Sequence, residues 1–184
     1  MKKPLLILLI AILALTALAC EISASDIEML IDLLPTSEPY TDPALYGNPP
    51  FDCIPTNEIE YATVTFIYDG DTIQVEMDGE KYKVRFVGIN TPERETFYFW
   101  EATQANAELL PIGTEVMLIR DTNDVDKYDR LVRYVVADDV FVNYELVLNG
   151  YAYSKTYHPD TACDATFKAA MQTAEENQVG LHQP

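Results

Sequence analysis

The stretch that decides the fold runs from residue 61 to residue 86 and reads YATVTFIYDGDTIQVEMDGEKYKVRF. Apolar and polar side chains alternate in three consecutive segments, centred on Val64, Val75 and Val84. This two-residue period is typical of β-strands that bury one face. We therefore predict three strands that follow one another directly along the chain.

Two short turns join these strands. Asp78-Gly79 favours a type I′ hairpin turn, because both central residues of that turn need a positive φ and this pair tolerates it. Asp69-Gly70 makes a similar tight link between the first and second strands. Consecutive strands are therefore expected to pair with each other.

More elements follow residue 86. Two further strands are predicted at Glu115–Arg120 and Leu131–Ala137. Helices are predicted at Trp100–Leu110, Asn143–Leu148 and, roughly, Thr161–Gln178. Five strands with three helices favour a β-barrel with helices (α+β), of the five-stranded OB-fold type, over residues 58–184. The fold alone assigns no activity, since many OB barrels bind ligands without catalysis.

The start of the chain has the pattern of an export signal. Lys2 and Lys3 precede an apolar run from Leu5 to Leu18, and small residues lead to Cys20. The run is shorter than the about 20 apolar residues that a membrane-spanning helix needs. We therefore expect residues 1–19 to be removed as a signal peptide.

Two cleavage patterns overlap at this point. Leu18-Ala19-Cys20 resembles a bacterial lipobox, in which the cysteine is lipidated and anchors the protein in the membrane. Ala17-Leu18-Ala19 also fits an ordinary A-x-A site, which would release a secreted protein. Both stay open, and we favour the cell-surface lipoprotein anchored through Cys20.

Residues 20–57 are predicted to form an acidic, proline-rich tether, because they show no sustained strand pattern. Within them, Ser25-Asp26-Ile27-Glu28 matches a capping box and predicts one short amphipathic helix.

Cys53 and Cys163 remain as a pair once Cys20 is assigned to lipid. In an oxidising compartment such a pair can form a disulfide. The alternative is a buried free thiol, because Cys163 shares an apolar helical stripe with Phe167 and Ala170. Sequence does not decide between them, since it does not show whether the two Cα atoms come within about 7 Å.

The composition is that of a globular protein with a strongly acidic surface. Hydrophobic residues make up 48% of the chain, and the formal net charge is −18. Loss of Lys2 and Lys3 with the signal would take that charge to −20. Such a field repels nucleic acid, and its simplest interpretation is solubility outside the cell.

Four ionic side chains nevertheless suggest phosphodiester chemistry. Asp71, Arg85, Glu93 and Arg130 occur in that order, and carboxylates can hold a hard cation while guanidiniums clamp phosphoryl oxygens. Each has a simpler interpretation: a turn residue for Asp71, ion pairs with nearby acids for the arginines, a surface residue for Glu93. Because Asp71 follows a glycine turn, we expect its carboxylate to be presented at an edge rather than buried.

Four motifs, taken in their order along the chain, make the interpretation as phosphodiester chemistry specific. They are Asp69-Gly70-Asp71-Thr72, the run from Arg85 to Glu93, Asp126-Lys127-Tyr128-Asp129-Arg130, and Val142 to Gly150. With them, residues from Tyr61 to Leu181 resemble the staphylococcal nuclease (thermonuclease) family. The resemblance implies an OB-fold nuclease that uses Ca²⁺ to cut DNA, leaving 3′-phosphate ends, with RNA open as a second substrate.

The resemblance also implies a role for individual residues. The catalytic residues would be Arg85, Glu93 and Arg130. The calcium ligands would be Asp71, Asn90 and the carbonyl of Thr91. The residues lining the nucleotide pocket would be Lys127 and Tyr128. Tyr151, Tyr153 and Tyr157 are further candidates for stacking on bases, with ordinary packing as the alternative.

Two positions depart from the family pattern. Asn90 stands where the best-known member has aspartate, which removes a negative charge and predicts weaker calcium binding. Asp129 stands where the family usually has glycine, next to Arg130. These departures keep open an alternative function, a non-catalytic OB-fold surface module with a degraded nuclease site. No protein partner is expected, and the protein is expected to be a monomer.

Overall fold

The computed structural model describes residues 50–56 and 59–184. The signal peptide, Cys20 and the short amphipathic helix expected in the tether lie outside the described residues. Within the described residues, no helix combines the length and the apolar character that a membrane crossing requires.

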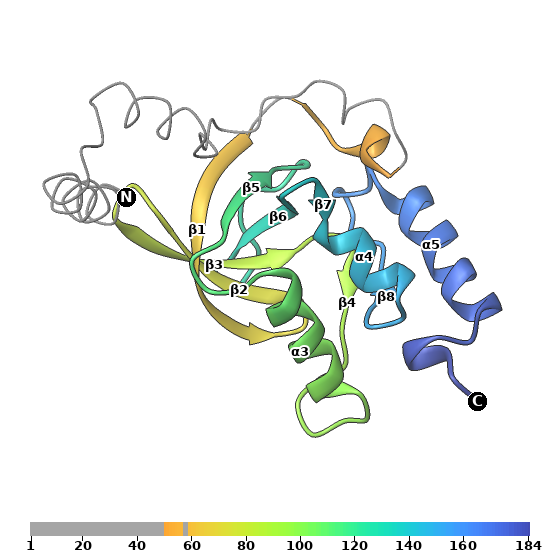
Figure 1. Cartoon of the computed structure of the whole chain (residues 1–184). Helices are drawn as coiled ribbons and strands as arrows, with labels where there is room; N and C mark the ends of the chain where they lie inside the picture. Colours follow the sequence, from red (N-terminus) through yellow and green to blue (C-terminus); the bar gives the residue numbers. More distant parts are fainter. Residues whose placement is uncertain (1–49, 57–58) are drawn as a thin grey trace, which may run out of the picture. The chain divides into compact units, whose positions relative to one another are not determined.

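Five strands close into a barrel (Figure 1). Three pair antiparallel in chain order, and they are β1 (Ile59–Asp69), β2 (Thr72–Met77) and β3 (Glu80–Phe86). β5 (Glu115–Ile119) lies antiparallel to β1, and β6 (Leu131–Ala137) lies antiparallel to β5. β6 also pairs in parallel with β3, which closes the ring. The predicted five-stranded OB-type barrel is therefore confirmed.

Both predicted turns form. Asp78 and Gly79 have φ angles of 53° and 83°, as a type I′ hairpin requires. Asp69 and Gly70 link β1 to β2 at a point where space is restricted. A Cβ atom on Gly70 would lie 2.7 Å from Cγ2 of Thr91, which is too close for any side chain. The turn is thereby packed tightly against the Thr91 segment.

The three predicted helices are present, with ends shifted by a few residues. They are α3 (Phe99–Leu109), α4 (Val142–Leu148) and α5 (Asp164–Glu176). Short elements that the sequence did not predict are β4 (Ile89–Asn90), β7 (Val140–Phe141), β8 (Tyr153–Ser154) and the 3₁₀ turns η2 (Phe51–Cys53) and η3 (Gly180–His182). Two-residue strands are too short for their side chains to show a period. The pairing of β4 with β8 holds the segment that follows β3 against the segment that follows α4.

A disulfide joins Cys53 in η2 to Cys163 at the start of α5, with 4.9 Å between the Cα atoms. Cys163 is fully buried beside Phe167 and Ala170, as the free-thiol alternative supposed, but its sulfur is bonded. The bond spans 110 residues of chain and ties the segment that precedes β1 to the last helix.

Candidate active site

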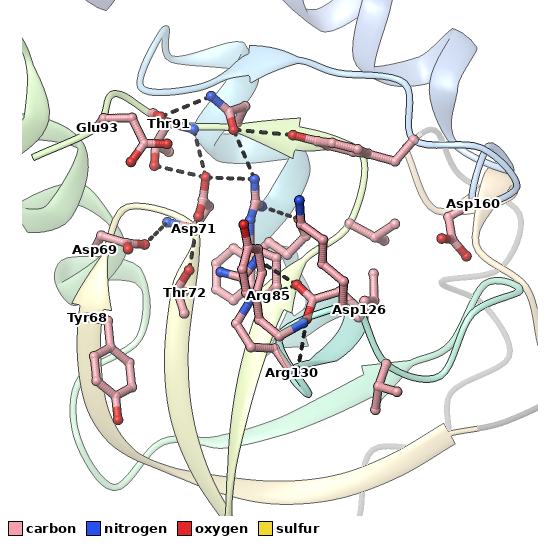
Figure 2. A pocket seen from close by; sticks show the side chains of 18 of the residues that line it. Tyr68, Asp69, Asp71, Thr72, Arg85, Thr91, Glu93, Asp126, Arg130 and Asp160 are labelled. Atoms are coloured by element: carbon pink, nitrogen blue, oxygen red, sulfur yellow. Dashed lines mark hydrogen bonds and ion pairs between the residues drawn. The ribbon is translucent and has the colours of Figure 1, made fainter.

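One pocket of about 830 Å³ opens beside the barrel (Figure 2). Its walls come from the β1–β2 turn, the end of β3, the segment after β4 and the segments around residues 123–130 and 157–160. All of the catalytic, calcium-binding and nucleotide-binding residues expected from the sequence line it, namely Asp71, Arg85, Asn90, Thr91, Glu93, Lys127, Tyr128 and Arg130. The fold therefore brings together groups that are spread over sixty positions of sequence.

Strand register explains why Asp71 and Arg85 meet. Thr72, the first residue of β2, pairs with Arg85 near the end of β3. The backbone N–H of Phe86 also donates to the carbonyl of Asp71, at 2.9 Å. The two side chains consequently project into the pocket side by side, and Nη2 of Arg85 lies 3.2 Å from Oδ2 of Asp71.

The carboxylate of Asp71 is buried, contrary to our expectation that it would stand exposed at an edge. Asp71 is 6% exposed, because the chain that follows β4 covers the turn. Thr91 satisfies Oδ2 of Asp71 with its backbone N–H at 2.7 Å and its hydroxyl at 3.0 Å. The buried charge is thus balanced by one guanidinium and by hydrogen bonds.

Asn90 is tied into the same network. Its Oδ1 accepts from Nη2 of Arg85 at 3.1 Å and from the hydroxyl of Tyr157 at 3.3 Å. Its amide nitrogen donates to the carbonyl of Thr91 at 3.2 Å. An aspartate could not make this last contact, since an ionised carboxylate has no N–H to donate. The neutral side chain therefore engages one of the oxygens that the resemblance assigns to calcium.

The donor set near Asp71 suits a hard cation. The oxygens of the carboxylate of Asp71, the amide of Asn90 and the carbonyl of Thr91 belong to one hydrogen-bonded network, and oxygen ligands are those that calcium prefers. Burial, followed by the charge of Asp71, raises the pKa of Asp69 above its ordinary value. A bound cation lowers the electrostatic repulsion between neighbouring carboxylates. Within the described residues, however, no three Asp, Glu, His or Cys side chains are grouped so that together they could hold a metal ion.

Arg130 occupies the other side of the pocket as an ion pair with Asp126. Its Nη2 and Nε lie 2.6 Å and 2.8 Å from Oδ2 of Asp126. Partial burial pushes the pKa of Asp126 upward, but the hydrogen bonds from Arg130 and Tyr128 outweigh it and hold that pKa below its ordinary value. The ion pair with a nearby acid that the sequence suggested for Arg130 is therefore present. Among the described residues, Nη1 of Arg130 has no protein acceptor.

Asp129 adopts a left-handed backbone conformation, with φ of 62°. Glycine adopts this conformation at little cost, and aspartate is among the residues that tolerate it. The departure at this position thus preserves the turn that carries Arg130. Tyr128 is exposed, with Nζ of Lys127 4.9 Å and Cζ of Arg130 5.4 Å from its ring centroid.

Glu93 lies exposed at the rim, on the segment between Thr91 and α3 (Figure 2). Its backbone carbonyl accepts from the N–H of Thr96 at 3.0 Å, which closes a turn. In the part of the chain that the structure describes, its carboxylate has no hydrogen bond or ion pair. The side chain is thus accessible to solvent and to any group bound in the pocket.

Sequence reasoning missed one buried carboxylate of the pocket wall. Asp160 is 4% exposed and accepts from the N–H groups of Thr122 and Asn123, at 3.0 Å and 2.7 Å. The side-chain amide of Asn123 adds a third bond of 2.7 Å. Asp160 lies thirty positions beyond Arg130 and outside every motif, so no sequence pattern marked it.

The tyrosines proposed to stack on bases divide into two groups. Tyr157 lines the pocket, and its ring centroid lies 5.9 Å from Cζ of Arg85. Tyr151 instead packs against Tyr98, and Tyr153 packs against His182. Neither of these two lines the pocket, so ordinary packing is what the structure shows for them.

Comparisons with known proteins agree with this geometry. The profile of the family described as staphylococcal nuclease homologue matches residues 83–183, more than half of the chain. Thermonuclease from Staphylococcus intermedius is 28% identical over 128 residues, covering 62% of this chain and 71% of that protein. Endonuclease YncB from Bacillus subtilis is 33% identical over 121 residues, covering 61% of this chain and 57% of that protein. The chain belongs to the staphylococcal nuclease family.

Proposed function

We propose that this protein is an exported nuclease that hydrolyses phosphodiester bonds in DNA, with RNA as a second substrate, and leaves 3′-phosphate ends. The observation that carries the proposal is the convergence of Asp71, Arg85, Glu93 and Arg130 in one pocket. Family membership supports it, as do the names thermonuclease and endonuclease borne by relatives.

Two guanidiniums would bind the phosphate. Arg85 is held by Asp71, Asn90 and the carbonyl of Ile89, so its orientation is fixed before substrate arrives. Arg130 is held by Asp126 while its Nη1 keeps its donors for a ligand. Preorganised cations stabilise the charge that builds on the phosphoryl oxygens in the transition state.

Glu93 would act as the general base, because its exposed carboxylate can accept a proton from a water at the pocket rim. The water oxygen forms a bond to phosphorus as the bond from phosphorus to the 5′ oxygen breaks in line. The leaving oxygen takes up a proton from solvent and becomes a 5′ hydroxyl. The phosphoryl group stays on the 3′ oxygen, which gives the proposed products.

Calcium is proposed as the cofactor, held by Asp71, Asn90 and the Thr91 carbonyl. When bound, such a cation supplies positive charge that offsets the charge of the phosphoryl group. Binding would compete with the contacts that Arg85 and the Asn90 amide now make to the same oxygens. Together with the missing charge at Asn90, this favours a weak site of the kind that works at extracellular calcium concentrations.

Export is proposed from the signal pattern together with the disulfide. A bond between Cys53 and Cys163 persists where the environment is oxidising, as it is outside the cytoplasm. We propose a monomer, attached to the membrane by lipid at Cys20.

The test is digestion of single-stranded DNA by the purified protein in calcium or in chelator. Cleavage is expected only with calcium, and Glu93→Gln and Arg85→Lys are each expected to lower kcat by about 10²-fold or more. Ile112→Ala, which changes an exposed residue beyond the other end of α3, is the matched control. End analysis should find 3′-phosphates. Cleavage that continues in chelator, or that survives loss of Glu93, would contradict the mechanism.

A non-catalytic binding module remains the second candidate, and Asn90 is the observation that favours it. Its amide engages the Thr91 carbonyl, and its neutral side chain brings no charge to the proposed calcium site. Such a module would bind a partner or a polysaccharide at the cell surface, and it predicts equilibrium binding without turnover and without a response to calcium.

A further inference from the structure

Two aromatic side chains beside the pocket are left uncovered by the fold. Phe97 is 80% exposed and Trp100 is 74% exposed, which makes them the most exposed large apolar residues in the described part of the chain. They belong to a run of four aromatics, Phe97-Tyr98-Phe99-Trp100, that leads into α3. Burial is the usual outcome for such large apolar groups, so this pair needs an explanation.

The backbone separates the four rings into two pairs. Tyr98 has a φ of 70°, an unfavourable conformation for a bulky residue, and it marks the start of α3. The ring of Tyr98 packs on Tyr151 at 6.0 Å, and Phe99 is buried. The fold therefore uses the middle two rings for packing and leaves Phe97 and Trp100 outside.

Trp100 lies against the wall of the pocket. Phe99 lines the pocket, and the ring of Trp100 meets it edge-on at a centroid distance of 5.1 Å. The guanidinium of Arg94, which also lines the pocket, lies 5.8 Å from the same Phe99 ring. A strand that leaves the pocket at Phe99 would therefore lie close to the cation of Arg94 and the bare ring of Trp100. Phe97 is three positions before Trp100 and is the next exposed ring along the chain.

We propose that Phe97 and Trp100 form a stacking platform, here called the aromatic ridge, for the unpaired bases of a nucleic-acid strand bound in the pocket. This inference rests on the proposed function. A chain with a formal charge of −18 repels phosphates over most of its surface, so contacts that do not depend on charge become valuable. Stacking on an aromatic ring is such a contact, and every base offers a face for it.

Single strands fit the aromatic ridge better than duplexes do. Bases in a duplex are already stacked on their neighbours and must be separated before they can lie on a side chain. The ridge thus predicts a preference for unpaired or frayed DNA that arises from binding rather than from the chemistry in the pocket. A nucleic-acid strand is the occupant to which we commit, because Trp100 contacts Phe99 of the pocket wall, and a lipid surface is an outcome of the test below.

Trp100 is the only tryptophan of the chain, so its fluorescence reports directly on the ridge. A twelve-residue oligomer of thymidylate, labelled for anisotropy, is titrated onto the full protein carrying Glu93→Gln to prevent cleavage. We expect quenching that saturates together with the anisotropy. An abasic oligomer of the same length, which keeps the phosphates but has no bases, is expected to leave Trp100 fluorescence unchanged.

Substitutions give a second readout. Phe97→Ala and Trp100→Ala are each expected to weaken binding of the thymidylate oligomer by about 5- to 100-fold, the range for one stacked base. Trp100→Phe should restore most of that loss, and Ile112→Ala, which replaces a residue that is 69% exposed, should have no effect. The loss should persist at high salt, because stacking releases no counterions.

The failure of this inference and the failure of the proposed function give different results. Binding seen by anisotropy with unchanged Trp100 fluorescence and full affinity in both alanine variants would overturn the ridge and leave the nuclease proposal standing. Absence of any oligomer binding would overturn both. A fluorescence shift with phospholipid vesicles but not with the oligomer would overturn the ridge in favour of a membrane contact.

Discussion

The carboxylate of Asp160 holds Asn123 by two hydrogen bonds of 2.7 Å, one from the backbone and one from the side-chain amide. Asn123 begins the segment that carries Lys127, Tyr128 and Arg130 into the pocket. A buried acid from the far end of the chain thus fixes the position of one phosphate-binding arm.

Asp160→Ala should therefore lower both stability and activity. Loss of the acceptor leaves three N–H groups without their partner, which costs about 1–3 kcal/mol of unfolding free energy. We expect kcat/KM on single-stranded DNA to fall even under conditions in which circular dichroism shows that the variant is folded, so that unfolding does not explain the loss of activity. Asp52→Asn, at an exposed carboxylate, is the control and should stay within about 0.5 kcal/mol of the parent. Full activity in folded Asp160→Ala would show that this anchor is not needed.

Asn90→Asp should strengthen calcium binding. The substitution adds a negative charge and frees the Thr91 carbonyl from the Asn90 amide. We expect the calcium dissociation constant, measured by calorimetry without substrate, to fall by about tenfold, the effect of roughly 1.4 kcal/mol. Asn149→Asp, at a surface asparagine away from the pocket, controls for added charge. An unchanged calcium affinity would argue that Asn90 is not a ligand.

Removal of the disulfide should destabilise the domain substantially. The bond spans 110 residues, and crosslinks over long loops contribute about 2–5 kcal/mol. Cys53→Ala combined with Cys163→Ala should lower the unfolding free energy by that amount in urea titrations. Addition of a reductant should lower the stability of the parent and leave the double variant unchanged. Equal stability of the two proteins under oxidising conditions would contradict the prediction.

The ion pair between Asp126 and Arg130 predicts a specific dependence of stability on pH. The pKa of Asp126 is lowered in the fold, so the ionised form is favoured by folding. Its contribution is complete above the ordinary value of 3.8 and disappears as the pH falls through the lower value of the folded state.

Asp126→Asn tests this directly. The parent should be the more stable protein at pH 7, and the difference should shrink below pH 3.8. Urea unfolding at a series of pH values measures it. A difference that stays constant down to the lowest pH would mean that the charge of Asp126 plays no part.

Local chemistry explains which features the sequence predicted. Both hairpins and the three helices depend on short-range patterns, such as the positive φ angles of Asp78 and Gly79, and these were predicted close to their observed positions. The pocket residues were predicted because four motifs keep their order. Each motif is a short run of residues, so each could be found in the sequence without knowledge of the fold.

Long-range packing explains what the sequence did not predict. The burial of Asp71 depends on Thr91, twenty positions downstream, and on the absence of a Cβ atom at Gly70. Asp160 acquires its role only when the chain returns to the segment at Asn123. β4 and β8 are each two residues long, so they exist only through their mutual pairing.

The bond between Cys53 and Cys163 also has a mechanical consequence. A pull on the chain ahead of residue 53 would be transmitted through the disulfide to the start of α5 and would bypass the start of β1. If the protein is held by its N-terminal segment and pulled by flow or by a bound polymer, the strands of the barrel therefore stay paired. After reduction of the disulfide the same force would act on β1, which would be the first strand to separate from its neighbours.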